Sequence, residues 1–248
     1  MNMVRNLGVA LLLMAILSLP LSGQAVQPAA KPAGPPQIAA PPAAAAPGAY
    51  TPEQQYLFDI FKNRRSVRKY LPTPVPEAHL RQILDIARTA PTSGNQQPWK
   101  FLVIRDRAKL DRLLDATVEF YAAQYREKKN PSDAELAEFK DKIRKMDAPY
   151  LGAPVYIVVL TDSQSQYPTY NHFDGPMAAV CLFVAARALG YGTVFCTDSF
   201  PFEVVKQVFA ISDRYEVVCT TPLGVPDGWP VSKEKKPLES FVAFEKLE

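Results

Sequence analysis

Three arginines and a serine fall within five consecutive residues of this chain, Arg64-Arg65-Ser66-Val67-Arg68. A guanidinium presents a planar fork of N–H donors that matches the oxygens of a phosphate, and a serine hydroxyl adds one more donor. The run therefore suits an anionic ligand. An exposed basic turn explains it equally well, so the run alone does not establish a binding site.

A polar segment, Pro91 to Trp99, follows with the sequence PTSGNQQPW. Its hydroxyl and amide side chains stand beside Gly94, where the backbone can approach a planar ligand closely. Taken alone, the segment is better explained as a polar turn before a strand. A third segment near the C-terminus, Ser232 to Leu238, is rich in lysine and would ordinarily be solvated surface. Together, the segments favour a ligand that is anionic at one end and flat and heteroaromatic at the other.

The composition limits the class of protein. The 248 residues suffice for one domain with a substantial core, or for two small ones, and the 48% hydrophobic and 21% charged content is typical of globular proteins. A net charge of +3, with basic and acidic residues interleaved, argues against a nucleic-acid-binding face. Three cysteines in apolar runs fit no zinc pattern, and two histidines are too few for a histidine-based metal site.

The N-terminal residues have the pattern of a secretory signal peptide. Arg5 precedes an apolar run from Leu7 to Leu21, and small residues then permit cleavage after Ala25. We expect residues 1–25 to direct export to the periplasm or, if uncleaved, to anchor the chain in the membrane with the domain outside. Residues 26–49 are rich in Pro and Ala and are predicted to form an extended linker, so the folded domain is residues 50–248.

Helices and strands alternate along this domain. Helices are predicted after Thr51, at 80–87, after Asp106, after Ser132, at 175–189 and at 203–209, and strands at 100–104, 155–160, 193–196 and 216–221. The run 155–160 is apolar throughout, which predicts a strand buried on both faces. The helix at 175–189 is apolar on nearly every side, which predicts a central or interfacial position, with Asp174 as its N-cap. Strands interleaved with helices favour a layered α+β domain.

Five short motifs, in this order and at this spacing, make residues 50–241 resemble the FMN-dependent nitroreductase family. The motifs are RRSxR at 64–68, PTSGNQQPW at 91–99, ARALGYGT at 186–193, PLG at 222–224 and KxKxPL at 233–238. The resemblance implies an α/β sandwich of the α+β class, with a central, mostly antiparallel sheet flanked by helices. It also implies a domain-entwined homodimer with two FMN sites at the interface.

By the same resemblance, three groups of residues bind FMN. The phosphate and ribityl chain would contact the basic run and the tail lysines, namely Arg64, Arg65, Ser66, Arg68, Lys233 and Lys235. The isoalloxazine would face the polar segment across the dimer, through Pro91, Thr92, Ser93 and Asn95. Thr197 and Asp198 would lie near flavin N5, where family members provide backbone N–H donors.

The chain departs from the family pattern at two of these places. Thr197-Asp198 replaces a Gly-Gly or Glu-Gly pair, so a backbone donor remains while the Asp198 carboxylate is expected to lower the flavin potential. Lys235 stands where the family usually has Arg, which replaces a forked donor by a point charge and is expected to weaken the phosphate contact.

The resemblance implies an oxidoreductase that reduces a small electron-poor acceptor, nitroaromatic or quinone-like, by ping-pong hydride transfer from NADH or NADPH. The export signal conflicts with this donor, because nicotinamide donors are chiefly cytoplasmic. Two alternatives therefore stay open. One is a flavin-dependent reductive dehalogenase or dehydrogenase with a non-nicotinamide donor, similar to the membrane-anchored deiodinase branch. The other is a non-catalytic flavin-binding module. A lid over the flavin is expected from residues 118–150.

Overall fold

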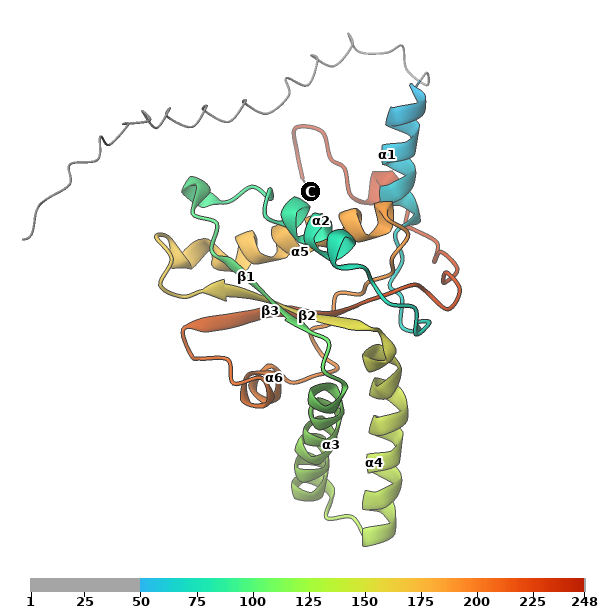
Figure 1. Cartoon of the computed structure of the whole chain (residues 1–248), viewed down its shortest axis with the longest axis vertical. Helices are drawn as coiled ribbons and strands as arrows, with labels where there is room; N and C mark the ends of the chain where they lie inside the picture. The colour runs from blue at the N-terminus through green and yellow to red at the C-terminus, as the bar shows by residue number, and fades with distance from the viewer. Residues whose placement is uncertain (1–49, 248) are drawn as a thin grey trace, which may run out of the picture. The chain divides into compact units, whose positions relative to one another are not determined.

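A three-stranded antiparallel sheet lies at the centre of the residues that the structure describes, 50–247 (Figure 1). The structure is a computed structural model, and the predicted signal peptide and linker, 1–25 and 26–49, lie outside the described residues. The strands are β1 (Trp99–Ile104), β2 (Val155–Asp162) and β3 (Tyr215–Leu223), in the order β1-β2-β3. All eight residues of β2 are buried, which confirms the buried strand predicted at 155–160.

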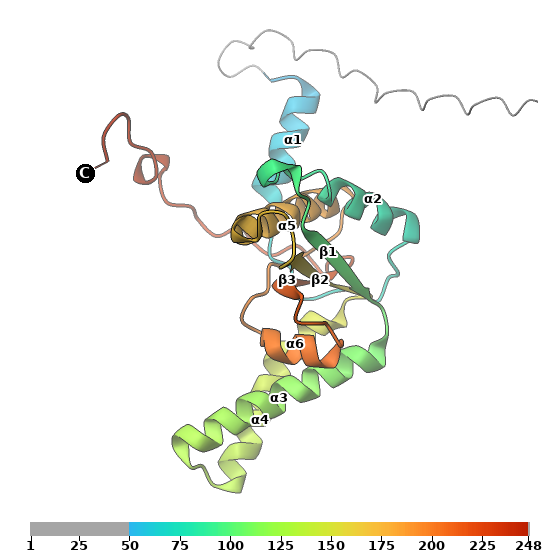
Figure 2. The ribbon, with the colours of Figure 1, turned by 90° about the vertical axis from the view of Figure 1, so that its left-hand side faces the viewer.

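Helices cover both faces of this sheet. The α-helices of the described chain are α1 (Pro52–Asn63), α2 (Glu77–Ala87), α3 (Arg107–Lys129), α4 (Asp133–Asp147), α5 (Asn171–Ala188) and α6 (Phe202–Val208). Short 3-10 turns are η1 (Ser93–Asn95), η2 (Ala148–Gly152), η3 (Pro168–Tyr170) and η4 (Leu238–Ser240). Helices α2 and α5 lie on one face, whereas α3 and α6 lie on the other with α4 packed along α3 (Figure 2). The α+β sandwich expected from the sequence is confirmed.

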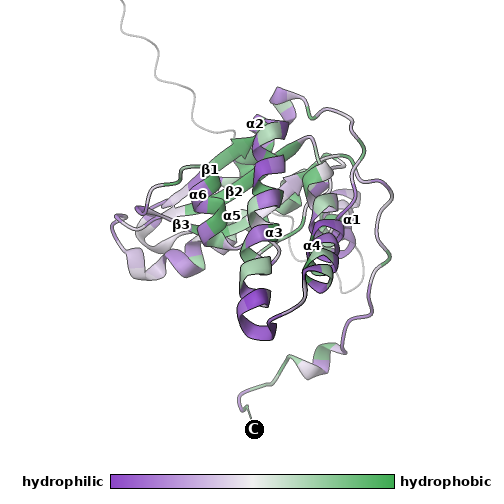
Figure 3. Ribbon diagram, turned by 90° about the horizontal axis from the view of Figure 1, so that it is seen from below, coloured by the Kyte–Doolittle hydropathy of each residue, from purple (hydrophilic) through white to green (hydrophobic). Residues whose placement is uncertain are grey.

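Two hydrophobic cores fill these layers. Between α2, α5 and the sheet, Ile83, Ile157 and Leu182 are fully buried, and on the opposite face Leu113 and Val158 are fully buried as well. Each such side chain contributes about 1.5–3 kcal/mol by leaving water. Figure 3 shows hydrophobic strands and hydrophilic outer ends on the α3–α4 pair, so this helical hairpin projects from the core into solvent.

Side-chain caps determine where several helices begin. Thr51 and Gln54 form a reciprocal capping box at the start of α1, with distances of 3.0 and 3.3 Å. Asp106 accepts hydrogen bonds from the first N–H groups of α3, and Ser132 with Glu135 caps α4. A side-chain cap satisfies N–H groups that have no partner within the helix, so it favours a helix start at that residue. These three starts agree with the sequence prediction.

Helix α5 begins four residues before its predicted start at Gly175. The turn η3 leads directly into the helix, and the Asn171 side chain donates a hydrogen bond to the carbonyl of Asp162 at 2.8 Å, which holds the first turn against the end of β2. Asp174 therefore lies inside the first turn, and its assignment as the N-cap was wrong.

The predicted strand at 193–196 was also wrong in part, since this segment forms only isolated bridges. Thr193 bridges in parallel to Ser66, and Cys196 bridges to Thr220 of β3. Between these bridges, the N–H of Val194 donates to the side-chain oxygen of Thr221 at 3.3 Å instead of to a backbone carbonyl. This side-chain contact interrupts the ladder. The bridges still extend the sheet beyond β3 and place Ser66 at its far edge.

Within residues 50–247, we find no helix that combines the length and the apolar character needed to cross a membrane.

Candidate functional site

The basic run and the C-terminal lysines meet in one cavity of about 470 Å³, which we call the basic cavity. Its lining residues are Phe61, Lys62, Arg64, Arg65, Ser66, Arg68, Pro230, Val231, Ser232, Lys233 and Lys235. The structure thus brings together all six residues that the resemblance assigned to the phosphate end of FMN, although they come from segments far apart in sequence.

Local hydrogen bonds orient two of the arginines in the basic cavity. Arg65 donates to the carbonyl of Lys62 at 2.8 Å and to that of Arg64 at 3.0 Å, so it also closes the last turn of α1. Arg68 donates through Nε to the hydroxyl of Tyr150 at 2.8 Å and through a terminal nitrogen to the carbonyl of Ser66 at 3.2 Å. Each guanidinium has five donors, so both keep donors for a ligand.

The donor set of the basic cavity fits a phosphate group. Within the described chain, the lining includes six cationic side chains and two hydroxyl groups, and it includes no carboxylate. Forked guanidiniums and ammonium groups are the side chains that proteins use to bind phosphate. The cavity therefore suits the phosphate end of the cofactor that the resemblance implied.

The polar segment that carries Pro91, Thr92, Ser93 and Asn95 forms a compact turn at the start of α5. Backbone φ angles are positive at Gly94, Asn95 and Gln97. A side chain at Gly94 would lie 2.5 Å from the ring of Tyr167, so glycine is required there by both the backbone angle and the lack of space. Tyr167 fills only the side on which a Cβ would lie, and Gly94 itself is exposed, so close access of a planar ligand to this backbone stays a prediction.

Asp174 and Gln96 hold this turn in place. Asp174 accepts a hydrogen bond from the N–H of Ser93 at 3.2 Å and another from the Gln96 amide at 2.6 Å. The Gln96 amide oxygen accepts from the N–H of Tyr167 at 2.7 Å. The buried carboxylate of Asp174 is therefore an anchor of the polar turn, which replaces the N-cap role predicted for it.

The basic cavity and the polar turn lie at opposite edges of the sheet within one chain. The polar turn leads into β1, whereas the basic run begins beyond β3, with Ser66 bridged to the segment 192–196. Four strand-to-strand steps of about 4.8 Å separate these edges by about 19 Å. One copy of the chain therefore does not bring both halves of the expected site together.

Thr197 and Asp198 are exposed and follow the bridge at Cys196, without lining the basic cavity. The hydroxyl of Tyr121 on α3 donates to the Asp198 carbonyl at 2.7 Å. The stretch 118–150, from which the lid was expected, thus contacts this segment through Tyr121 on α3 and the basic run through Tyr150 on η2.

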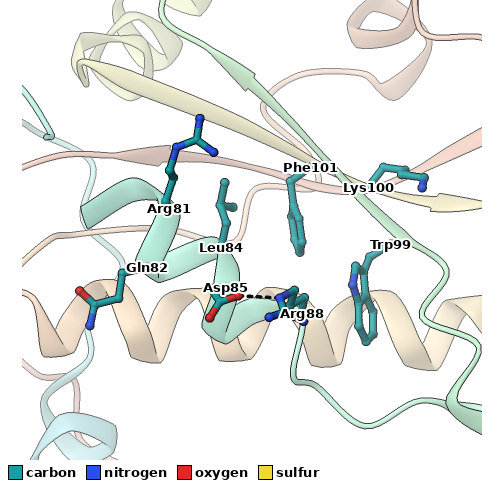
Figure 4. Close-up of a pocket in the computed structure, with 8 residues that line it drawn as sticks. All are labelled: Arg81, Gln82, Leu84, Asp85, Arg88, Trp99, Lys100 and Phe101. Atoms are coloured by element: carbon teal, nitrogen blue, oxygen red, sulfur yellow. Dashed lines mark hydrogen bonds and ion pairs between the residues drawn. The ribbon is translucent and has the colours of Figure 1, made fainter. Parts of the chain in front are cut away.

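A second cavity, larger and more open at about 750 Å³, lies between α2 and the edge strand β1 (Figure 4). Its lining residues are Arg81, Gln82, Leu84, Asp85, Arg88, Trp99, Lys100 and Phe101. Arg88 is paired with Asp85 at 2.6 Å, and the aromatic rings of Trp99 and Phe101 form the apolar side. None of the predicted site residues lines this cavity. Among the described residues, we find no group of three or more His, Cys, Asp or Glu side chains placed to hold a metal.

Comparison with known proteins identifies the family. Residues 61–225 match the nitroreductase family. The chain belongs to the nitroreductase family. Among its relatives, a 4-nitrobenzoate reductase of Pseudomonas putida is 28% identical over 68% of this chain and 84% of its own length. An iodotyrosine deiodinase of Thermotoga neapolitana is 28% identical over 69% of this chain and 89% of its own length.

Solved structures share the fold of this chain. A BluB-like flavoprotein from Clostridium difficile 630 superposes with a TM-score of 0.63 and 24% identity, covering 77% of this chain and 99% of that one. An iodotyrosine deiodinase bound to FMN and 3-iodo-L-tyrosine superposes with a TM-score of 0.62 and 22% identity, covering 77% of this chain and all of that one. At these identities the superpositions establish the nitroreductase fold.

Three residues that shape the site were not identified from the sequence. Gln96 stood inside the predicted polar segment and could have been noticed as a side chain able to bind two partners. Asp174 has a carboxylate that can accept hydrogen bonds, but its role as anchor of the polar turn depends on where α5 begins. Tyr150 had no local signal, because its contact with Arg68 links positions far apart in the chain.

Proposed function

We propose that this protein is an FMN-dependent oxidoreductase that reduces a small electron-poor acceptor of the nitroaromatic or quinone type. The observation that carries the proposal is the basic cavity, where three arginines and two tail lysines converge around Ser66. Family membership supports it, because relatives include a 4-nitrobenzoate reductase and an FMN-bound deiodinase.

In this proposal the protein positions and shields the cofactor. Arg64, Arg68 and the tail lysines would neutralise its phosphate, and the polar turn anchored by Asp174 would supply donors to its ring. FMN, when bound, supplies the hydride chemistry between a donor and an acceptor. The chain's own task is to orient that group, and no side-chain nucleophile is needed.

We also propose a homodimer, since α5 leaves an apolar stripe uncovered. Phe173, Met177 and Val180 are 61%, 42% and 46% exposed and recur at helical spacing on one face. Exposed apolar stripes of this kind mark protein interfaces. A second copy packed on this face would bring its polar turn toward the first copy's basic cavity and complete the site that one chain leaves divided.

The C-terminal tail suits a role in the same dimer. Every residue from 229 to 247 is exposed, including Phe241 at 70% and Phe244 at 89%. The cavity beside β1 offers Trp99 and Phe101 together with cations, and the last part of the tail, 238–248, carries three glutamates and one lysine around Phe241 and Phe244. We infer that the tail of one copy docks in this cavity of the other, against the open edge of β1.

A second candidate function is reductive dehalogenation with the same cofactor. It is favoured by the similarity to iodotyrosine deiodinases in both sequence and fold. The predicted signal peptide adds support, because an exported enzyme would meet few nicotinamide donors.

We propose export to the periplasm on the pattern of residues 1–25. Cell fractionation of the tagged chain tests this location, and recovery of the chain from the cytoplasm alone would contradict it.

The flavin content of the purified protein tests the proposed function. We expect an FMN absorption spectrum with one flavin per chain, and loss of the oxidised band on rapid anaerobic mixing with NADH or NADPH. Bleaching by dithionite but by neither nicotinamide would favour the second candidate. A folded, colourless protein that does not bind added FMN would contradict both.

The double variant Arg64→Ala/Arg68→Ala tests the assignment of the basic cavity. Charge-assisted hydrogen bonds contribute about 1.5–3 kcal/mol each, so FMN affinity should fall by roughly 100-fold or more while the thermal transition is kept. Lys109→Ala/Arg112→Ala, which removes two exposed cations of α3, is the matched control and should bind FMN normally. Full flavin content in Arg64→Ala/Arg68→Ala would show that the assignment is wrong.

A further inference from the structure

A close contact between a cation and an aromatic ring joins the end of α5 to the start of the C-terminal tail. The guanidinium of Arg187, in the last turn of α5, lies 3.8 Å from the centroid of the Trp229 ring. A cation within about 6 Å of a ring centroid is attracted to the ring face, and tryptophan is the strongest such partner. Trp229 is 40% exposed and Arg187 is half-buried, so water screens the contact only in part.

The Arg187 side chain has this ring as its polar partner. Within residues 50–247, its guanidinium makes no hydrogen bond and no ion pair. The helix dipole favours a cation in the last turn of α5, which accounts for the charge of Arg187. The dipole does not account for a guanidinium that lies against a ring from a segment far along the chain. The contact therefore fixes the position of Trp229 relative to α5.

Backbone pairing holds the chain before the tail only as far as Asp227. The N–H of Asp227 donates to the carbonyl of Lys69 at 3.0 Å, directly after the basic run. Gly228 then turns the chain with a φ of 77°, a conformation that favours glycine. Among the described residues, 230–247 form no hydrogen bond or ion pair with the rest of the chain. The Trp229 ring is therefore the last directional contact before the tail lysines.

The length of chain between this contact and the lysines shows how much the contact matters. Lys233 follows Trp229 by four residues, which span at most about 14 Å when extended. It follows Asp227 by six residues, which span about 21 Å. Loss of the ring contact would therefore enlarge the volume open to the lysine about threefold, and its local concentration at the basic cavity would fall by the same factor.

We propose that Arg187 and Trp229 are positioning residues that hold the start of the tail so that Lys233 and Lys235 stay at the basic cavity. The two lysines line this cavity, whereas Arg187 does not. Arg187 therefore acts on a bound anion only through the ring and the tail. That the anion is FMN rests on the proposed function, whereas the anchoring of the tail belongs to the protein alone.

FMN titration of Arg187→Met tests the positioning role. Methionine keeps an unbranched side chain and removes the charge, so FMN affinity should fall by about threefold, as the local concentration of the lysines does. Arg187→Lys keeps a cation for the ring and should restore most of the loss. Arg112→Met, at an exposed arginine of α3, is the matched control and should bind FMN like the wild type. Wild-type affinity in Arg187→Met would overturn the proposal.

Combined variants show whether the effect passes through the ring and the lysines. On the background Lys233→Ala/Lys235→Ala, Arg187→Met should lower FMN affinity no further, because the charges that it positions are gone. Likewise, Arg187→Met should add nothing to Trp229→Leu, since the leucine has already removed the ring contact. A further loss of about threefold on either background would overturn the proposal, because Arg187 would then act by another route.

Tryptophan fluorescence tests the anchoring without flavin. The chain has two tryptophans and Trp99 is buried, so the emission that is lost in Trp229→Phe belongs to Trp229. Acrylamide should quench this component more strongly in Arg187→Met, because the ring no longer lies against a guanidinium, and as in the wild type in Arg112→Met. Equal quenching in the wild type and Arg187→Met would overturn the anchoring. If no variant binds FMN, the proposed function fails, and this measurement still decides whether the tail is anchored.

Discussion

Asp174 accepts a hydrogen bond from a backbone N–H group, as the sequence predicted, but the donor belongs to the polar turn and not to α5. An acidic residue before a long apolar helix is a typical N-cap, and that was the expectation. The helix begins earlier because Asn171 is bound to the end of β2, and Asp174 then points its carboxylate at the polar turn. Its effect on function should therefore come through the turn.

The substitution Asp174→Ala tests this role. It removes the hydrogen bonds from the Ser93 N–H and the Gln96 amide, so the polar turn should lose its fixed shape. We expect FMN affinity to fall by about tenfold or more, which corresponds to one charge-assisted hydrogen bond. Fluorescence titration of FMN measures it. Asp213→Ala, at an exposed site paired with Lys206, is the control, and equal affinities in the two variants would rule out the anchoring role.

Asp162 gives a pH-dependent prediction at the same scale. Hydrogen bonds from Arg214 lower its pKa to about 2 from 3.8, helped by the N–H of Gln164 at 2.9 Å. A carboxyl with a lowered folded-state pKa stabilises the fold above its unfolded pKa and loses that contribution as pH falls through the folded one. The stability advantage of the wild type over Asp162→Asn should therefore be complete above about pH 4 and vanish toward about pH 2.

Thermal unfolding of the wild type and Asp162→Asn across this pH range is the measurement. Asp133→Asn, at an exposed site in the first turn of α4, should show no such trend. A difference that stays constant with pH would mean that Asp162 acts through packing and not through its charge.

At the scale of elements, local chemistry predicted most of the fold. Three helix starts were predictable because each cap involves residues only two or three positions apart in the sequence. These caps are the capping box at Thr51, the Asp106 cap and the capping box at Ser132. The segment 193–196 was not predictable in this way. Its pairing depends on whether Val194 donates to a backbone carbonyl or to Thr221, which is decided by contacts distant in sequence.

Packing of α5 on the sheet gives the element-scale prediction. A Cβ atom at Gly175 would lie 2.4 Å from a methyl of Val218 and 2.9 Å from a methyl of Thr161, so the helix approaches the strands as closely as glycine allows. Gly175→Val should lower the free energy of unfolding by about 1–3 kcal/mol, as overpacking does. Chemical denaturation measures this loss. Gly152→Ala, where no atom lies within 4 Å of the added Cβ, should change stability little.

At the scale of the whole molecule, the two groups of residues that the resemblance assigns to the FMN site lie at opposite edges of one chain. The sequence motifs predicted both halves and their ligand class, since each half is a short local run. They did not reveal how far apart the halves lie, because that distance depends on the order β1-β2-β3 and on the bridge between Ser66 and Thr193. We propose, from the exposed face of α5 and the exposed tail, that a second copy closes the gap.

Mixed dimers test this central claim most directly. One copy carries Arg64→Ala/Arg68→Ala and the other carries Asp174→Ala, and two different affinity tags isolate dimers that contain both. If each site combines the basic cavity of one copy with the polar turn of the other, one site receives both defects and the other receives none. We therefore predict one FMN per mixed dimer, bound with wild-type affinity. Two weakened sites, each carrying the defect of one variant, with no site of wild-type affinity, would contradict the account.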